Sequence, residues 1–108
     1  MKTINFEERS EQLEIAGKVY SVCVSNYDFI KKVQASMADL EVAQKKLKDD
    51  NGIEDIMEAL KQVINLALDD FDRIWKEANH DIYDMIDVCM AIAEIIQKGF
   101  EYKARKYV

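Results

Sequence analysis

Few residues of this chain are of a type that does chemistry. The single histidine, His80, stands beside Asp81 and three residues before Asp84, so these side chains are in principle able to share a metal ion. Zinc sites, however, combine several histidine or cysteine ligands at short fixed spacings, which this sequence lacks. Carboxylates at the start of a helix are far more often caps. We therefore expect no metal site and no cofactor.

The two cysteines are the next candidates. Cys23 or Cys89, placed against His80, would form a nucleophilic pair only if the thiol lost its proton. Both stand inside apolar patterns, where burial raises the pKa of a thiol. Residues 1–9 also lack the apolar stretch of a secretory leader, so we expect reduced, structural thiols in a cytoplasmic protein.

The acidic residues do not match the pattern of a calcium-binding loop. The groups at residues 49–54 and 69–72 lack the alternating ligands and terminal glutamate of such a loop, so we expect them to cap helices and face solvent. Three scattered glycines cannot form a phosphate-binding loop. The sequence therefore predicts a protein without enzymatic activity.

The length and the net charge of the chain limit the classes of partner that it is expected to bind. The chain has 108 residues, the size of one domain, and a formal net charge of −6 that repels nucleic acid. The apolar runs fall far short of the roughly 20 residues that span a bilayer. We expect neither nucleic acid nor membrane as a partner. The one basic cluster is expected to stabilise the end of the last helix through its dipole; it comprises Lys98, Lys103, Arg105 and Lys106.

The elements that position these residues start with a hairpin. Residues 13–24 alternate apolar and polar side chains, as strands do, and Gly17 supplies the positive φ of a tight turn. The preceding residues 1–10 are expected to form a loosely held arm or a first strand. An isolated hairpin is marginally stable in water, so it must pack on helices or pair with another chain.

Helical periodicity begins after Asn26. Either Ser25 or Asn26 is expected to be the N-cap of this helix. The helix carries an apolar stripe from Ile30 to Leu47. Asn51-Gly52 favours a stop. Further helical segments are predicted at 53–68, at 71–75 with Asp69 or Asp70 as cap, and from Ile82 with Asp81 as cap and Asp84 in its first turn.

The expected fold is mainly α: a short N-terminal β-hairpin followed by three to four helices packed as a small bundle. We predict a single domain, residues 1–108, with an arm and hairpin in residues 1–25 and a helical body in residues 26–108. The absence of proline permits long helices.

The last helix is apolar around more than half of its circumference, which is typical of a helix central to a core or shared between subunits. We therefore expect a homo-oligomer. Trp75 is either a core anchor under a loop or an interface hot spot. The residues predicted for a partner or oligomer interface are Val22, Val24, Trp75, Ile82, Met85, Ile92, Ile96 and Phe100.

In their order, the elements resemble a family of small phage tail assembly chaperones from tailed phages and prophages of Gram-positive bacteria. The resemblance covers almost the whole chain. It is carried by Leu13–Tyr20, which is similar to the family's I-x-G-K-x-Y opening, by Leu66–Trp75 and by Asp81–Ile96. The glycine that often follows the family's middle aspartate is absent here, where the chain reads Asp69-Asp70-Phe71-Asp72.

The resemblance implies a non-enzymatic protein of the bacterial cytoplasm. Its partner would be the tape-measure protein, a long helical chain that the chaperone keeps soluble while tail-tube subunits polymerise around it. Two alternatives stay open from the residues alone: a permanent structural subunit of an assembly, or a small regulatory interaction protein. Both would be helical homo-oligomers.

Overall fold

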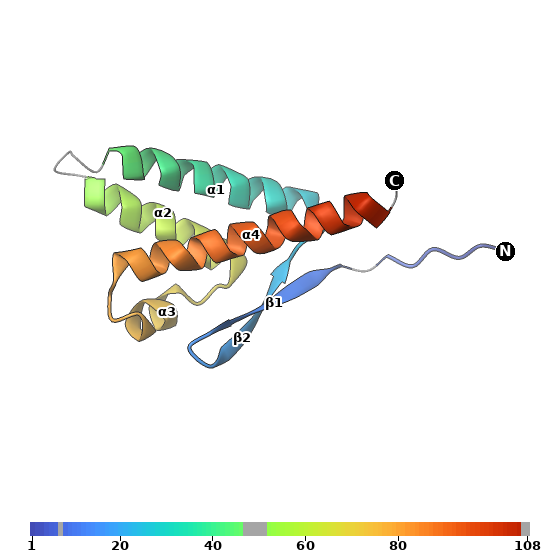
Figure 1. Ribbon diagram of the computed structural model, residues 1–108, viewed down its shortest axis with the longest axis horizontal. Coiled ribbons are helices and arrows are strands. Elements are labelled where there is room, and N and C mark those ends of the chain that lie inside the picture. The colour runs from blue at the N-terminus through green and yellow to red at the C-terminus, as the bar shows by residue number, and fades with distance from the viewer. Residues whose placement is uncertain (7, 47–51, 107–108) are drawn as a thin grey trace.

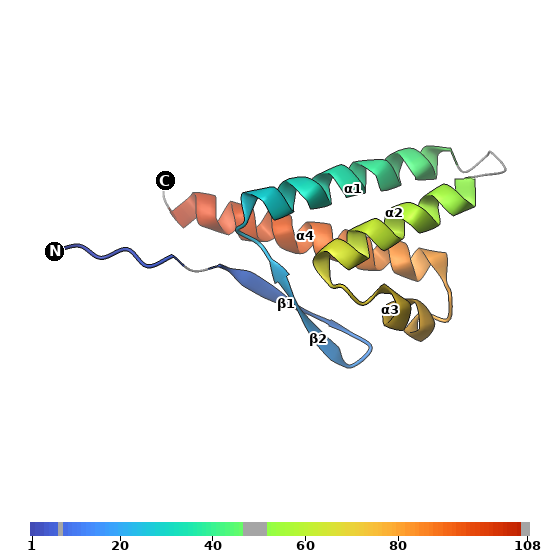
Figure 2. The same cartoon turned by 180° about the vertical axis from the view of Figure 1, so that it is seen from behind.

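The computed structural model describes residues 1–6, 8–46 and 52–106, with only the backbone for residues 100–106. The described residues form a hairpin and then four helices (Figures 1 and 2), which confirms the predicted fold class. The elements are β1 (Ser10–Ile15), β2 (Lys18–Cys23), α1 (Tyr27–Lys45), α2 (Gly52–Ala67), α3 (Phe71–Glu77) and α4 (Ile82–Lys106).

The hairpin has the register that its alternation predicts. The strands are antiparallel, with Leu13 opposite Tyr20 and Glu11 opposite Val22. Directly opposite residues share a face of the sheet, and on this face Tyr20 and Val22 are buried in the main core, with Leu13 packed against it. The other face carries exposed Gln12 and other polar residues. The hairpin is thus stabilised by packing on the helices.

The hairpin turn contains one unfavourable residue. Ala16 and Gly17 occupy its two central positions with φ of 49° and 83°. Two positive φ values match a type I′ turn, for which Asn-Gly is the preferred pair, whereas alanine resists the left-handed conformation.

Ala16→Asn is expected to raise the free energy of unfolding by about 0.5–1 kcal/mol, because asparagine tolerates this conformation. Urea unfolding of the variant and the native chain measures the difference. Gly17→Ala is the opposite control and should destabilise the chain, since nothing obstructs its Cβ and backbone strain alone acts. A stabilised Gly17→Ala would contradict this description of the turn.

The first two helices form an antiparallel pair. Asn26 is the N-cap of α1, since its Oδ1 accepts a hydrogen bond from the Phe29 amide at 3.0 Å, which decides between the two predicted caps. Gly52 is the first residue of α2, so it does not end the preceding helix as predicted. Leu47, Asn51 and the acidic residues 49 and 50 lie outside the described residues.

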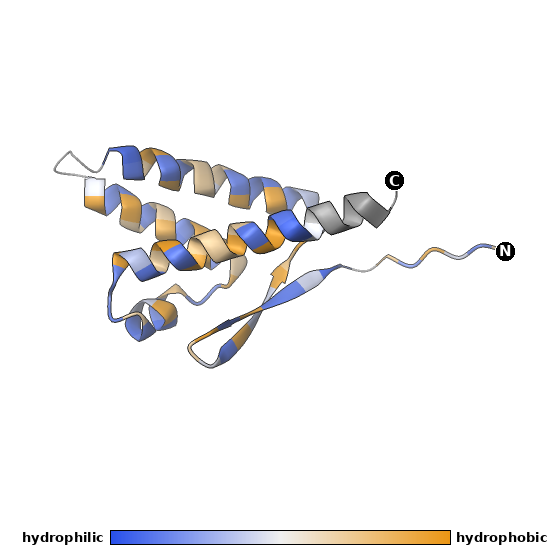
Figure 3. Ribbon diagram, in the orientation of Figure 1, coloured by the Kyte–Doolittle hydropathy of each residue, from blue (hydrophilic) through white to orange (hydrophobic). Residues whose placement is uncertain are grey.

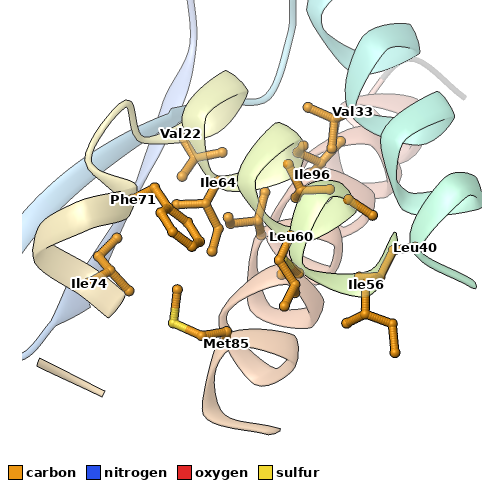
Figure 4. Packing of buried hydrophobic residues seen from close by; sticks show 14 of the residues in the cluster. Val22, Val33, Leu40, Ile56, Leu60, Ile64, Phe71, Ile74, Met85 and Ile96 are labelled. Carbon is orange, nitrogen blue, oxygen red and sulfur yellow. The ribbon is translucent and has the colours of Figure 1, made fainter. Parts of the chain in front are cut away.

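One apolar core joins all six elements. α2 contributes the row Ile56, Leu60 and Ile64, which lies between α1 on one side and α3 with α4 on the other (Figure 4). The residues that surround this row are at most 6% exposed; among those labelled in Figure 4 they are Val22, Val33, Leu40, Phe71, Ile74, Met85 and Ile96. Apolar residues of each helix recur at helical spacing between polar ones (Figure 3).

Two local features fix α4. Oδ1 of Asp81 accepts hydrogen bonds from the amides of Tyr83 and Asp84, at 2.8 and 3.2 Å, which confirms Asp81 as the predicted cap. Near the other end, a Cβ on Gly99 would lie 2.7 Å from Cβ of Val24. Glycine at this position therefore lets α4 approach the chain end of β2. In the described part of the chain, no helix combines the length and apolarity needed to cross a membrane.

Candidate functional site

An apolar groove lies between α1 and α4. It has a volume of about 880 Å³. Its floor is apolar, because the buried Val33, Leu40 and Ile96 lie at the bottom with half-buried Ile30 and Met37. We call this feature the α1/α4 groove.

The rim of the α1/α4 groove is exposed and mostly uncharged. Ala38 and Met90 lie on it, and Met90 is 56% exposed. The charged side chains of the lining are one lysine and one glutamate, Lys31 and Glu41. An apolar floor with a polar rim is the usual anatomy of a protein-binding surface.

The groove follows α1 over most of its length. On α1 its lining runs from Tyr27 to Gln44, which at 1.5 Å per residue is about 26 Å. The α1 residues concerned recur at intervals of three and four, as on one face of a helix. On α4 the lining runs from Met90 to Gln97 with the same spacing. The groove is therefore elongated along α1 and shorter along α4.

A second feature is a polar cluster that joins the hairpin to the loop before α3. We define the polar cluster as Lys18, Tyr20, Asp70 and Arg73. The Tyr20 hydroxyl donates to Oδ2 of Asp70 at 2.6 Å, and the Lys18 ammonium donates to the same oxygen at 3.0 Å. The Arg73 guanidinium donates to the Tyr20 hydroxyl at 2.9 Å. These bonds link residues about fifty positions apart in sequence.

Arg73 also holds the hairpin turn. Its guanidinium donates to the carbonyl oxygens of Ile15 and Ala16 at 3.3 and 2.9 Å. A planar guanidinium with several fixed donors suits such a forked contact, and a lysine does not. The polar cluster therefore fixes the orientation of the hairpin on the helical body. It joins Gly17-Lys18-Val19-Tyr20 to Asp70-Phe71-Asp72-Arg73, two of the stretches on which the family resemblance is based.

Asp70 differs from its predicted role. It stands at the N-cap position of α3 but makes no capping hydrogen bond. Its carboxylate is occupied by Tyr20 and Lys18, and the Phe71 amide donates instead to Oδ1 of Asn65 at 3.3 Å. Asp70 is therefore the N-cap residue by position, as predicted, but its side chain does not cap α3 because Tyr20 and Lys18 bind the carboxylate.

The polar cluster shifts the acid–base behaviour of two members. Hydrogen bonds from Tyr20 and then Lys18 hold the pKa of Asp70 below its ordinary value of 3.8. Burial, with the hydrogen bond to Asp70 as a further cause, raises the pKa of Tyr20 above 10.0. At neutral pH, both shifts favour an ionised Asp70 carboxylate that accepts a hydrogen bond from the protonated Tyr20 hydroxyl.

The depressed pKa of Asp70 predicts a loss of stability in acid. The stabilisation is present above pH 3.8, the ordinary pKa, and disappears as the pH falls through the lower pKa of the folded state. Urea unfolding at pH 7, 4 and 3 should show a steeper decline for the native chain than for Asp70→Asn. Asp72→Asn, which changes an exposed carboxylate nearby, should decline like the native chain. Equal slopes for all three would contradict the assignment.

Trp75 lies in a row of stacked rings at the turn before α4. Its ring centroid is 5.9 Å from that of Phe71 and 4.7 Å from that of His80, with nearly parallel planes. Trp75 is half-buried against the core. This placement supports the interpretation as a core anchor, and the alternative as an interface hot spot stays a prediction. His80 stacks on Trp75, and Asp81 caps α4.

The remaining predicted interface residues lie mostly inside the single chain. Val22, Val24, Met85, Ile92 and Ile96 are buried in it, and Ile82 is half-buried. The side chain of Phe100 lies outside the described residues, as do those of Lys103, Arg105 and Lys106. That these residues form an interface stays a prediction; of the buried ones, Ile96 lies on the floor of the α1/α4 groove.

Several other lining residues of the α1/α4 groove were not among the predicted interface residues. Met37, Ala38, Met90 and Ala93 line the α1/α4 groove. The signal that pointed to them was present, because Met37 belongs to the stripe of the first helix and Met90 and Ala93 to the stripe of the last. The sequence did not reveal that α1 and α4 leave a groove along these stripes.

The cysteines are free thiols. Cys89 is fully buried, and its burial raises the pKa of the thiol to about 12, so it is protonated at neutral pH. In the described part of the chain, no three histidine, cysteine or acidic residues gather as a metal would require.

Known proteins give no further indication of what this geometry does. No family model, curated protein or solved structure matches the chain. The α1/α4 groove and the polar cluster are thus the features from which a function must be argued.

Proposed function

We propose that this protein is a non-enzymatic tail assembly chaperone of a tailed phage or prophage, which binds amphipathic helices of the tape-measure protein in the α1/α4 groove. The supporting observation is the groove itself, with its apolar floor of Val33, Leu40 and Ile96 and its mostly uncharged rim. The choice of partner rests on the resemblance of the sequence to that family.

An amphipathic helix suits the shape of the groove. A helix 17 residues long extends about 26 Å, the length of the groove along α1. Helices pack by placing residues three and four apart between those of their neighbours. The groove offers this spacing on both walls, so a third helix would bury its apolar stripe there, as in other helix-in-groove complexes.

A small molecule is a weaker match to the same groove. The volume of 880 Å³ is within the range of small-molecule sites, about 300–1,000 Å³. Such sites, however, place a few polar groups so that they converge on one ligand. Here the polar lining residues are exposed and lie along the rim, among them Lys31, Gln34 and Glu41.

The negative net charge of the chain is compatible with the binding of aggregation-prone helices. A long amphipathic helix with an uncovered apolar stripe self-associates in water. A partner with a net charge of −6 would cover this stripe and also bring like-charge repulsion to each complex. Both effects keep the helix soluble.

Co-expression tests the proposal. The tape-measure protein encoded beside this chain should remain insoluble when it is expressed alone and become soluble with the chain, as measured by its share in the supernatant after centrifugation. An unchanged soluble share would contradict the proposal.

Purified virions separate the chaperone from a permanent structural subunit. A chaperone leaves the assembly, so the chain should be absent from finished particles by mass spectrometry. Its presence in stoichiometric amount would support the structural alternative instead.

A further inference from the structure

Two features of this chain expose large apolar side chains. The first is the N-terminal arm, residues 1–8, of which the structure describes all but residue 7. In it Ile4 is 73% exposed and Phe6 is 96% exposed. The second is the α1/α4 groove, on whose rim Tyr27 and Met90 are more than half exposed. Exposed apolar side chains gathered in this way mark an association surface.

The arm starts beside one end of the groove. The Arg9 amide donates to Oγ of Ser25, and the Val24 amide donates to the Arg9 carbonyl oxygen, both at 2.9 Å. These bonds fasten the root of the arm two residues before Tyr27, where the lining of the groove begins. The arm itself belongs to no helix or strand of the described residues.

The arm also matches the groove in length and pattern. Eight extended residues reach about 27 Å, against about 26 Å for the groove along α1. Ile4 and Phe6 are two residues apart, so in an extended chain they point to the same side. Lys2 and Glu8 share this side, so Ile4 and Phe6 are able to face the apolar floor between two charged residues near the ends of the arm.

The direction of the arm favours a second copy over its own groove. From its root the arm runs away from the body, opposite to the course of α1 (Figures 1 and 2). To enter its own groove, the chain would have to reverse next to Arg9, and no glycine or proline occurs among the first 16 residues to ease a tight turn. A second copy can receive the arm without any reversal.

We propose that two copies of this chain exchange their N-terminal arms, so that Ile4 and Phe6 of each protomer lie in the α1/α4 groove of the other. The exchange is reciprocal and gives a closed two-fold dimer in which each copy is both donor and acceptor. The arm's partner is a second copy of this chain, and the arm and a tape-measure helix would compete for the same groove, so the exchanged dimer is the state of the chain without that helix.

Light scattering after size-exclusion chromatography of the purified full chain tests the exchange. At tens of micromolar the native mass should be twice the 12.5 kDa of one chain. Ile4→Asp with Phe6→Asp should halve this mass, because carboxylates in the arm would have to enter an apolar floor. Thr3→Asp with Asn5→Asp adds the same charge to the opposite side of the arm and should leave a dimer.

A second pair of variants tests the receiving groove. Ala38→Glu places a carboxylate on the rim, whereas Ala35→Glu places one on α1 at an exposed position outside the groove lining. Ala38→Glu should be a monomer and Ala35→Glu a dimer. Both positions are exposed, so the fold, checked by circular dichroism, should be unchanged.

Three results would overturn the exchange. A native chain that is monomeric at this concentration shows no exchange at all. A dimer that survives the two arm aspartates associates through another surface. A dimer that survives Ala38→Glu places the arm elsewhere. None of these measurements contains the tape-measure protein, so a failure here is distinct from a failure of the proposed function.

Discussion

Ile92→Asp should unfold the chain at room temperature. The Ile92 side chain is fully buried in the core on α4. The substitution removes its packing, worth about 2–5 kcal/mol for a large core residue, and leaves a carboxylate without a partner in an apolar setting, which adds several kcal/mol more. The total is comparable to the whole stability of a domain of this size, about 5–15 kcal/mol. Circular dichroism should show the loss of helix.

Met90→Asp is the matched control for this variant. It introduces the same charge on the same helix two residues earlier, but Met90 is 56% exposed on the rim of the groove. The chain should remain folded, with a change in unfolding free energy within about 0.5 kcal/mol, as is usual for surface positions. If Ile92→Asp folded normally or Met90→Asp unfolded, the assignment of the two faces of α4 would be wrong.

Arg73→Ala should destabilise the chain by about 2–3 kcal/mol. The substitution removes the hydrogen bonds of the guanidinium to the Tyr20 hydroxyl and to the carbonyl oxygens of Ile15 and Ala16. Because these bonds join the hairpin to α3, amide hydrogen exchange should rise most in β1 and β2. Urea unfolding gives the free energy, and exchange by mass spectrometry gives the location.

Arg73→Lys distinguishes the forked hydrogen bonds from charge alone. Lysine keeps the positive charge near Asp70 but has one compact donor group and cannot reach all three acceptors at once. Its stability should lie nearer to that of Arg73→Ala than to that of the native chain. Full stability in the lysine variant would mean that the charge, and not the geometry, holds the hairpin.

Local patterns were sufficient to predict the elements of the fold. Alternation identified both strands, and Gly17 marked the turn, because strand periodicity and positive φ are properties of a few neighbouring residues. Asn26 and Asp81 were recognised as caps for the same reason, since a cap bonds to amides two or three residues away.

Features that depend on distant contacts were missed. Asp70 stands at the predicted N-cap position, but its carboxylate is bound by Tyr20 and Lys18 from the hairpin, about fifty residues earlier, and makes no capping bond. The sequence correctly predicted an apolar stripe on α4. Within this stripe, however, Ile92 is enclosed by the core, whereas Met90 is exposed on the rim of the groove. Periodicity gives the face of a helix, but not how far its neighbours cover that face.

The α1/α4 groove is the feature on which the function proposed for this chain depends, and one co-expression measurement tests it most directly. The tape-measure protein is expressed with the native chain, with Ala38→Glu or with Ala35→Glu, and its soluble share is measured. We predict that Ala35→Glu keeps the tape-measure protein as soluble as the native chain does, and that Ala38→Glu loses most of this effect while folding normally. Equal solubility with the two variants would contradict the groove as the binding site.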